Sequence, residues 1–242
     1  MTGFHKQTSG YCHCCRSETV FESKDAWLRD FYKCRKCDSI PRQRHIQHIL
    51  DRHFSGWEKL AVHESSPSNK FIAQYCDSYS SSEFFGDITP GETKNGVRCE
   101  NLENLTFADS SFDIFITQDV FEHIFNPDIA AKEIARVLKP GGMHVFTAPK
   151  HKSVRRSYAR ATMKNGAIEY LLDAQYHGNP PGEGPILVTK DGPFLVTWDY
   201  GDDFEFILQN WTGCPTTTYI TRDDSIGLDG EYLEVFVTKK PV

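Results

Sequence analysis

The sequence predicts an α/β fold with a doubly wound, mostly parallel sheet, because two buried strands flank an amphipathic helix in the middle of the chain. Residues 112–117 and 143–148 have strand length and are mostly apolar, which is typical of strands covered on both faces. Between them, residues 126–138 repeat apolar side chains at spacings of three and four, after an Asn-Pro-Asp helix start. Such units are right-handed parallel crossovers. Residues 118–123 and 149–151 are therefore expected at the carboxyl edge, where open α/β sheets bind ligands.

Composition places the chain among ordinary globular proteins. Its 242 residues are 39% hydrophobic and 25% charged, which suits one large domain with a small appendage. No apolar run approaches the ~20 residues of a membrane helix, and residues 1–10 lack the apolar centre of a signal peptide. We therefore expect a cytoplasmic protein with no membrane partner. The net charge of −6 disfavours nucleic acid as a partner.

Five of the eight cysteines lie in the first 40 residues, which in a reducing compartment favours a metal site over disulfides. Four of them form two Cys-x-x-Cys pairs separated by eighteen residues: Cys12, Cys15, Cys34 and Cys37. This spacing is typical of a tetrahedral thiolate site with no open position, so a structural zinc is predicted. His13 or Cys14 can replace a neighbouring ligand, and unmetallated thiols are the alternative. Residues 1–40 are thus predicted as a zinc-ribbon-like segment with strands at 19–22 and 31–33.

Residues 41–57 are predicted to form a basic, histidine-rich helix that begins near Pro41. Its apolar side chains recur at helical spacing and should dock it on the body: Ile46, Ile49, Leu50 and Phe54. Its polar side chains are Arg42, Arg44, His45, His48, Arg52 and His53. We interpret this polar set as a solvated face, with the lining of a cleft as the alternative.

Three further strands are predicted before the central unit, at residues 59–64, 83–88 and 97–102. The first is followed by a serine-rich turn at 65–69, which should start a helix that continues through Tyr75. These elements complete the alternation of strands and helices that an α/β sheet requires.

The pattern weakens after the central unit. A basic run at residues 151–160 either binds an anionic acceptor or is a solvated surface. Helices are predicted at 161–176 and 200–209, and strands at 216–221 and 232–238.

Four motifs of the central region occur in a set order: residues 107–113 (FADSSFD), 119–123 (DVFEH), 136–142 (RVLKPGG) and Pro149. As a set they resemble the class I S-adenosylmethionine-dependent methyltransferases, of the type 11 kind. The resemblance covers roughly residues 58–150. It implies a Rossmann-like sheet with an antiparallel last strand, in a methyltransferase domain at 58–242 with a substrate-recognition insertion at about 151–200. It also implies that the helix at 41–57 is a lid over the cofactor.

The resemblance implies S-adenosylmethionine as the cofactor. Its methionine moiety is expected at the turn that follows the strand at residues 59–64. Glu64 is expected to pair with the ammonium of the methionine moiety, while Ser65, Ser66 and helix N–H groups receive its carboxylate. The turn departs from the family because it contains no glycine. Since this cofactor has no pyrophosphate that the backbone must approach, the departure is tolerable. The alternative is a capped helix start that has lost cofactor binding.

The next two strand ends are expected to hold the nucleoside. Asp87 should accept the ribose hydroxyls, with Glu83 as its competitor. Asn101 stands where the family often has an aspartate that contacts the adenine amino group, and its side-chain oxygen can still accept. Leu102 is expected to pack against the adenine or, alternatively, to fill the core.

The loop after residues 112–117 is expected to border the reacting groups. Gln118 and Asp119 should touch the methionine moiety. Three histidines are candidate general bases, because histidine titrates near neutral pH: His123, His151 and His177. For His123 the alternative is a structural role, in which its side chain holds the loop by a hydrogen bond.

The expected reaction is methyl transfer from S-adenosylmethionine to an oxygen, nitrogen or carbon nucleophile of a small, anionic acceptor. Catalysis would depend mainly on aligning nucleophile, methyl carbon and sulfur away from water. Two other functions fit the sequence. One is a catalytically inactive, methyltransferase-like binding module. The other is a protein or nucleic-acid methyltransferase that docks through the ribbon, which the acidic net charge disfavours.

Overall fold

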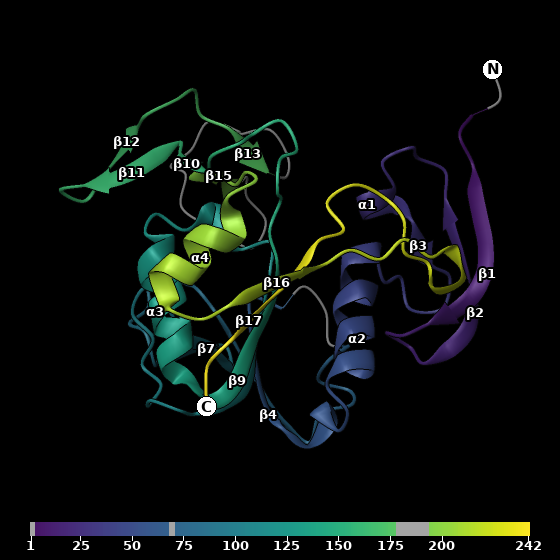
Figure 1. Cartoon of the computed structure of the whole chain (residues 1–242), viewed down its shortest axis with the longest axis horizontal. Helices are drawn as coiled ribbons and strands as arrows, with labels where there is room; N and C mark the ends of the chain where they lie inside the picture. Colours follow the sequence, from purple (N-terminus) through teal and green to yellow (C-terminus); the bar gives the residue numbers. More distant parts are fainter. Residues whose placement is uncertain (1–2, 68–70, 178–193) are drawn as a thin grey trace.

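The computed structural model describes residues 3–67, 71–177 and 194–242, and within them the centre of the molecule is an eight-stranded sheet (Figure 1). Its strands, in spatial order, are β16 (Thr216–Tyr219), β17 (Val235–Lys239), β9 (Leu138–Thr147), β8 (Phe112–Gln118), β4 (Ala61–Ser65), β5 (Ser78–Glu83), β7 (Val97–Cys99) and β6 (Thr93–Lys94). The five strands from β9 to β7 are mutually parallel, whereas β17 runs antiparallel between β9 and β16. The predicted mostly parallel α/β sheet with an antiparallel last strand is confirmed.

Helices cover both faces of this sheet (Figure 1). On one face lie α3 (Pro127–Val137) and α4 (Phe204–Thr212), and on the other lies α2 (Pro41–His53). The two cores use alternate side chains of the same strands, Phe115, Phe146 and Phe236 on one face and Ile114, Val145 and Val237 on the other. Because both faces are covered, β8 is apolar from Ile114 to Ile116.

The remaining helical segments are short: α1 (Leu28–Phe31), η1 (Trp57–Lys59), η2 (Phe121–His123) and η3 (Asp224–Ile226). No helix in the part of the chain that the structure describes has the length and apolar character needed to cross a membrane.

The second parallel strand lies earlier in the chain than the sequence pattern predicts. The expected strand at 83–88 is wrong, because β5 ends at Glu83 and the residues after it form a turn. Its sequence, SYSSSE, is too polar to stand out as a buried strand, and pairing with β4 and β7 determines its place. The helix expected through Tyr75 is also wrong, because residues 71–75 form turns.

The segment expected as a helix at 161–176 is instead made of strands. β11 (Ala161–Lys164) and β12 (Ala167–Tyr170) form a hairpin around Asn165 and Gly166, whose φ angles are 52° and 78°. Two positive φ angles at Asn-Gly are typical of the type I′ turn that closes two-residue hairpins. Two further short antiparallel pairs lie around this hairpin in the described part of the chain. β10 (Tyr158–Ala159) pairs with β15 (Trp198–Asp199), and β13 (Tyr176–His177) pairs with β14 (Phe194–Leu195).

The N-terminal segment is a small antiparallel sheet of β1 (Lys6–Cys12), β2 (Ser17–Ser23) and β3 (Lys33–Cys34). The loop between β16 and β17 reaches across to it (Figure 1). Lys6 Nζ lies 2.6 Å from carboxylate oxygens of Asp224 and Asp229 in that loop. A Cβ on Gly10 would lie 1.9 Å from the carbonyl oxygen of Ser225, so glycine permits this close contact.

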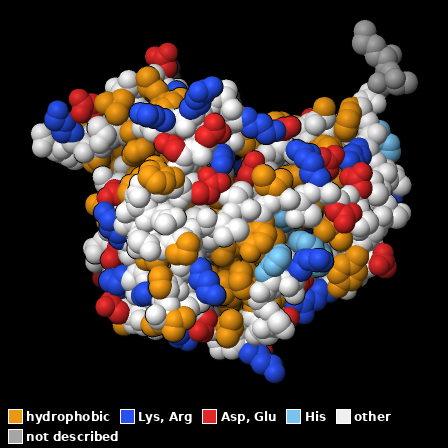
Figure 2. Space-filling view, in the orientation of Figure 1, with side chains coloured by type: hydrophobic (Ala, Val, Ile, Leu, Met, Phe, Trp, Pro, Cys, Tyr) orange, Lys and Arg blue, Asp and Glu red, His pale blue; other side chains and the backbone are white. Residues whose placement is uncertain are grey.

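The polar side of α2 is solvated only in part, which corrects the interpretation of a solvated face. Its exposed side chains are Arg52 and His53, whereas Arg42 and His48 are half-buried. Arg44 is fully buried and donates hydrogen bonds to the carbonyl oxygens of Tyr32 and Gly227, at 2.8 and 2.6 Å. His45 is also buried, and its Nδ1–H donates to the carbonyl oxygen of Leu233. Figure 2 shows histidines gathered on this face of the molecule. The helix therefore joins the N-terminal sheet and the C-terminal loop to the body.

Candidate functional site

The carboxyl edge of the parallel sheet brings Glu64 and Gln118 together. Gln118 Nε2 donates to Glu64 Oε1 at 2.7 Å, and the Tyr79 hydroxyl donates to Glu64 Oε2 at 2.9 Å. Burial of the carboxyl group raises the pKa of Glu64 to about 7, although these two hydrogen bonds oppose the rise. Glu64 can therefore be neutral or ionised near physiological pH, depending on what lies beside it.

Gln118 contributes a second acceptor at this place. Its Oε1 atom is buried and has no hydrogen-bond partner among the described residues. A buried acceptor without a donor is unfavourable, and burial of a carboxyl group without a nearby cation raises its pKa. An ammonium group would donate to Gln118 Oε1 and would favour the ionised form of Glu64. The pair thus fits the α-ammonium of an amino acid moiety.

The turn after β4 keeps a glycine-like backbone without a glycine. Ser66 has a φ of 53°, in the left-handed region, and its N–H donates to the carbonyl oxygen of Ser82 at 2.7 Å. Ser65 is buried at the end of β4. The backbone geometry that glycine usually provides is therefore present, with a serine at the strained position. Part of the helix start predicted here, residues 68–70, lies outside the described residues.

Asp87 does not stand at a strand end. It lies in the turn beyond β5, its side chain is exposed, and it pairs with Lys94 at 2.9 Å. The expectation that it lies near the end of the second strand is wrong, because that strand was placed five residues too late. Glu83, its competitor in the sequence analysis, is the last residue of β5.

Asp119 is held by two arginines from the N-terminal part of the chain. Its Oδ2 lies 2.6 Å from Arg29 Nη2 and 3.3 Å from Arg42 Nε, and its Oδ1 accepts from the Thr147 hydroxyl at 2.8 Å. Burial alone would raise the pKa of Asp119, but the charges of Arg42 and Arg29 outweigh it and lower the pKa. No local sequence pattern predicts either contact, because both arginines lie far from Asp119 along the chain. Arg29 is 90 positions away.

Glu122, His123 and His177 form a cluster beside this loop. Glu122 is buried in η2, and burial together with the charge of Asp119 raises its pKa well above the ordinary value. Glu122 Oε1 lies 3.8 Å from His123 Nε2 and 3.7 Å from His177 Nδ1. The Nδ1–H of His123 donates to the carbonyl oxygen of Leu195 at 2.8 Å, and burial lowers the pKa of His123 to about 4. The hydrogen bond considered as the structural alternative for His123 is thus present.

His151 stands apart from these two histidines. Its Nδ1 lies 3.2 Å from the Tyr232 hydroxyl, and its Nε2 lies 3.5 Å from Asp199 Oδ1. Asp199 is also bonded by Arg160 at 2.6 Å. The structure therefore brings together two of the three candidate bases and places the third in a separate set of polar contacts.

The central segment is similar to known methyltransferases. Residues 68–146 match the sequence model of a family described as a methyltransferase domain. Two curated relatives match a similar stretch. One is a ubiquinone/menaquinone biosynthesis C-methyltransferase of Shewanella frigidimarina, 36% identical over 67 residues, which are 26% of this chain and 27% of the relative.

The second relative is a ubiquinone biosynthesis O-methyltransferase of Parvibaculum lavamentivorans. It is 35% identical over 75 residues, which are 31% of this chain and 28% of the relative. The chain thus spans little more than a quarter of the length of these curated relatives. Among solved structures, an S-adenosylmethionine-dependent methyltransferase from Mesorhizobium loti is similar, with 11% identity and a TM-score of 0.49 over 81% of this chain and 98% of that one.

Asn101 and Leu102, which were expected to contact the adenine, have contacts within the chain. Asn101 Oδ1 accepts the backbone N–H of Glu103 at 2.9 Å, so this oxygen is already used within the loop. Leu102 is buried in the core together with Leu105, which agrees with the core alternative. Neither contact tests a role in cofactor binding.

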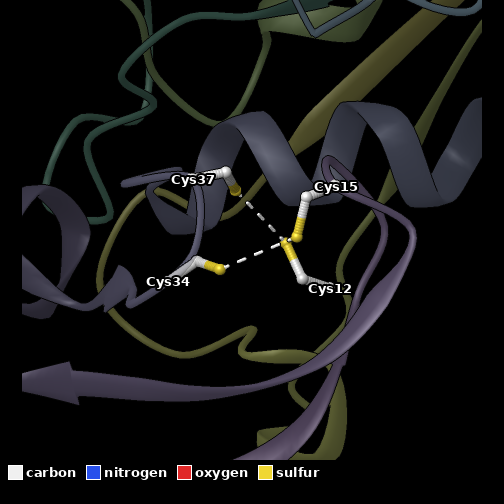
Figure 3. Close-up of side chains that lie close together, drawn as sticks. All are labelled: Cys12, Cys15, Cys34 and Cys37. Carbon is white, nitrogen blue, oxygen red and sulfur yellow. Dashed lines mark hydrogen bonds between the residues drawn. The ribbon is translucent and has the colours of Figure 1, made fainter.

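The N-terminal segment carries a cluster of four thiols: Cys12, Cys15, Cys34 and Cys37. Figure 3 shows their sulfur atoms pointing toward one another. The Sγ atoms of the first and last lie 3.7 Å apart, and those of the middle two 3.9 Å. Sulfurs at ~2.3 Å from a tetrahedral ion lie about 3.8 Å apart, so the cluster fits zinc.

The alternative ligands of this cluster have other contacts. His13 Nδ1 lies 2.8 Å from Asp51 Oδ2, and its Nε2 lies 3.0 Å from His48 Nδ1. Cys14 is fully buried, and burial raises the pKa of its thiol well above the ordinary value. It is not among the four thiols whose sulfur atoms lie within 4.8 Å of one another.

Proposed function

We propose that the protein is an S-adenosylmethionine-dependent methyltransferase that acts on a small, anionic acceptor. The observation that carries this proposal is the match of residues 68–146 to the methyltransferase family. The strand order and the acidic and amide side chains at the carboxyl edge support it.

The residues that would hold the cofactor lie along that edge. Glu64 and the unpartnered Oε1 of Gln118 would receive the ammonium, and Ser65 and Ser66 the carboxylate. Glu83 at the end of β5 is better placed than Asp87 to accept the ribose hydroxyls. Asn101 and Leu102 remain the residues proposed for the adenine.

When bound, the cofactor supplies a methyl group that is already activated for transfer. The chain's own contribution is to align the acceptor and to exclude water. A general base is needed only when the acceptor keeps its proton until the attack. His123 is neutral at pH 7 and therefore able to accept a proton, but its low pKa makes it a weak base. His151 and His177 are the other candidates.

The proposal of an anionic acceptor rests on fewer cationic side chains than the basic run at residues 151–160 contains. Within the basic run and just before it, three cations are already paired with carboxylates: Lys150 with Glu205, Lys152 with Glu231 and Arg160 with Asp199. For Arg155 and Arg156 no ion pair occurs within the described residues. These two arginines are the groups that we assign to recognition of a carboxylate or phosphate.

Titration calorimetry with S-adenosylmethionine and S-adenosylhomocysteine tests this function. We expect both to bind to zinc-loaded protein. Because a cation lowers the pKa of Glu64, binding at pH 6.5 should also release protons, seen as a heat that varies with the ionisation enthalpy of the buffer. Folded protein that binds neither ligand would exclude the enzyme and favour an inactive binding module, for which the glycine-free turn is the argument from the sequence.

We also propose that the four clustered cysteines hold one structural zinc ion. The proposal rests on the distances between their sulfur atoms. A thiol-specific organomercurial should release one equivalent of zinc from the wild type and none from Cys34→Ser. Wild-type protein that was refolded with zinc and released no metal would contradict the proposal.

A further inference from the structure

A second group of potential metal ligands lies in the described part of the chain, away from the thiols. The carboxylate oxygens of Glu122 and ring nitrogens of His123 and His177 lie within 4.8 Å of one another. Neither oxygen of Glu122 has a hydrogen-bond partner among the residues described, although the side chain is buried. A buried carboxyl group without partners is strongly unfavourable, so this position calls for a cation or a donor.

The two histidines are oriented by one small piece of sheet. The Nδ1–H of His123 donates to the carbonyl oxygen of Leu195 in β14, which leaves the lone pair of Nε2 on the side of Glu122. β14 pairs with β13, which carries His177. A backbone carbonyl that binds one ring nitrogen is the usual way in which proteins orient the other nitrogen toward a metal.

The distances are slightly longer than a bound ion requires. Glu122 Oε1 lies 3.8 Å from His123 Nε2 and 3.7 Å from His177 Nδ1. Ligands at ~2.1 Å from a metal lie about 3.0 to 3.4 Å apart, so each pair must close by about half an ångström. Side-chain rotation alone supplies a movement of this size. Two imidazoles and one carboxylate suit Zn²⁺, Fe²⁺, Co²⁺ or Mn²⁺ better than Mg²⁺ or Ca²⁺, which prefer ligands made entirely of oxygen.

We infer that Glu122, His123 and His177 form a second metal site, which takes a transition-metal dication such as Zn²⁺. Three protein ligands leave coordination positions open, unlike the four thiols. The loop of this site also carries Asp119 at the carboxyl edge. If the proposed methyltransferase function holds, an acceptor hydroxyl would bind at an open position, where the ion would lower its pKa.

Zinc stoichiometry tests this site without any measurement of methyl transfer. After equilibrium dialysis against Zn²⁺, the wild-type chain should hold about two equivalents per chain, of which the organomercurial releases only the thiol-bound one. Glu122→Gln keeps the shape of the side chain but removes its charge, and His177→Ala removes a ligand at the surface end of the cluster. Each variant should hold only one equivalent of zinc, the thiol-bound one that the organomercurial releases. His151→Ala, a nearby histidine outside the cluster, should keep both.

Two outcomes would overturn the site. One is a wild type that holds only the thiol-bound zinc. The other is a second equivalent that persists in Glu122→Gln and in His177→Ala, both folded by circular dichroism. Two equivalents of zinc in a protein that fails to bind S-adenosylmethionine would keep the metal site and reject the methyltransferase function instead.

Discussion

The N-terminal thiol cluster and the loop at the end of β8 both bring potential ligand side chains together, and they are held in opposite ways. The four thiols come from two tight turns, each within four residues of sequence. The loop at residues 118–123 depends on partners from distant parts of the chain, including Arg29 and Leu195. Each cysteine pair is thus determined by local sequence, whereas the electrostatics of the sheet edge depend on the whole fold.

The two regions are also connected. Arg29 belongs to α1, which lies between the two cysteine pairs, and its guanidinium reaches Asp119 on the sheet edge. Loss of the zinc should therefore disturb the edge as well as the ribbon.

The largest expected effect comes from Cys34→Ser. The small N-terminal sheet has little core of its own, so without zinc we expect it to unfold and the free energy of unfolding to fall by roughly 5 kcal/mol or more. Thermal and urea unfolding would measure this. Cys214→Ala, a buried cysteine outside the cluster, is the control and should cost about 1 kcal/mol. Equal effects of the two substitutions would remove the special role of the thiol cluster.

A smaller loss of stability is expected when the ion pair between Arg29 and Asp119, which connects the two regions, is removed. Arg29→Ala leaves the buried carboxylate of Asp119 with only Arg42 as a cation, and should lower the free energy of unfolding by about 3 kcal/mol. Combining it with Asp119→Asn should recover part of that loss, because no unpaired charge then remains. A double-mutant cycle in urea provides the measurement, and strict additivity would show that the pair is not coupled.

The pH dependence of stability should report Glu64. Its pKa is raised from 4.5 to about 7 in the folded state, so the folded protein binds the proton more tightly than the unfolded chain does. The resulting stabilisation is complete below pH 4.5 and is lost as the pH rises through 7, a change of about 3 kcal/mol. Glu64→Gln should flatten this part of the curve. An unchanged slope between pH 4.5 and 7 in this variant would assign the dependence to other groups.

The smallest expected effect concerns the ribose. Glu83→Ala should weaken the affinity for S-adenosylhomocysteine about tenfold, or about 1.4 kcal/mol, through loss of an acceptor at the end of β5. Asp87→Ala, which removes an exposed carboxylate that pairs with Lys94, should change the affinity less than about twofold. Calorimetry would compare the two, and the reverse order of effects would restore Asp87 as the ribose ligand.

Much of the fold could be predicted because its signals are local. β8, α3 and β9 carry apolar runs, a helix start and a helical repeat within about 35 residues, and all three elements are present. β5 was misplaced because its SYSSSE sequence has no apolar run, and its position depends on hydrogen bonds to β4 and β7. The β11 to β12 hairpin was missed although Asn165 and Gly166 carried a recognisable turn signal.

The sequence by itself determined the spacing of the thiols, the order of the methyltransferase motifs and the mostly parallel sheet. Only the tertiary structure decided that Gln118 lies against Glu64, that Arg29 neutralises Asp119 and that His177 joins Glu122 and His123. The physical reason is separation along the chain. Side chains within one turn or one strand follow the periodicity of the backbone, whereas pairs separated by 54 or 90 residues meet only when the sheet and the loops above it have packed.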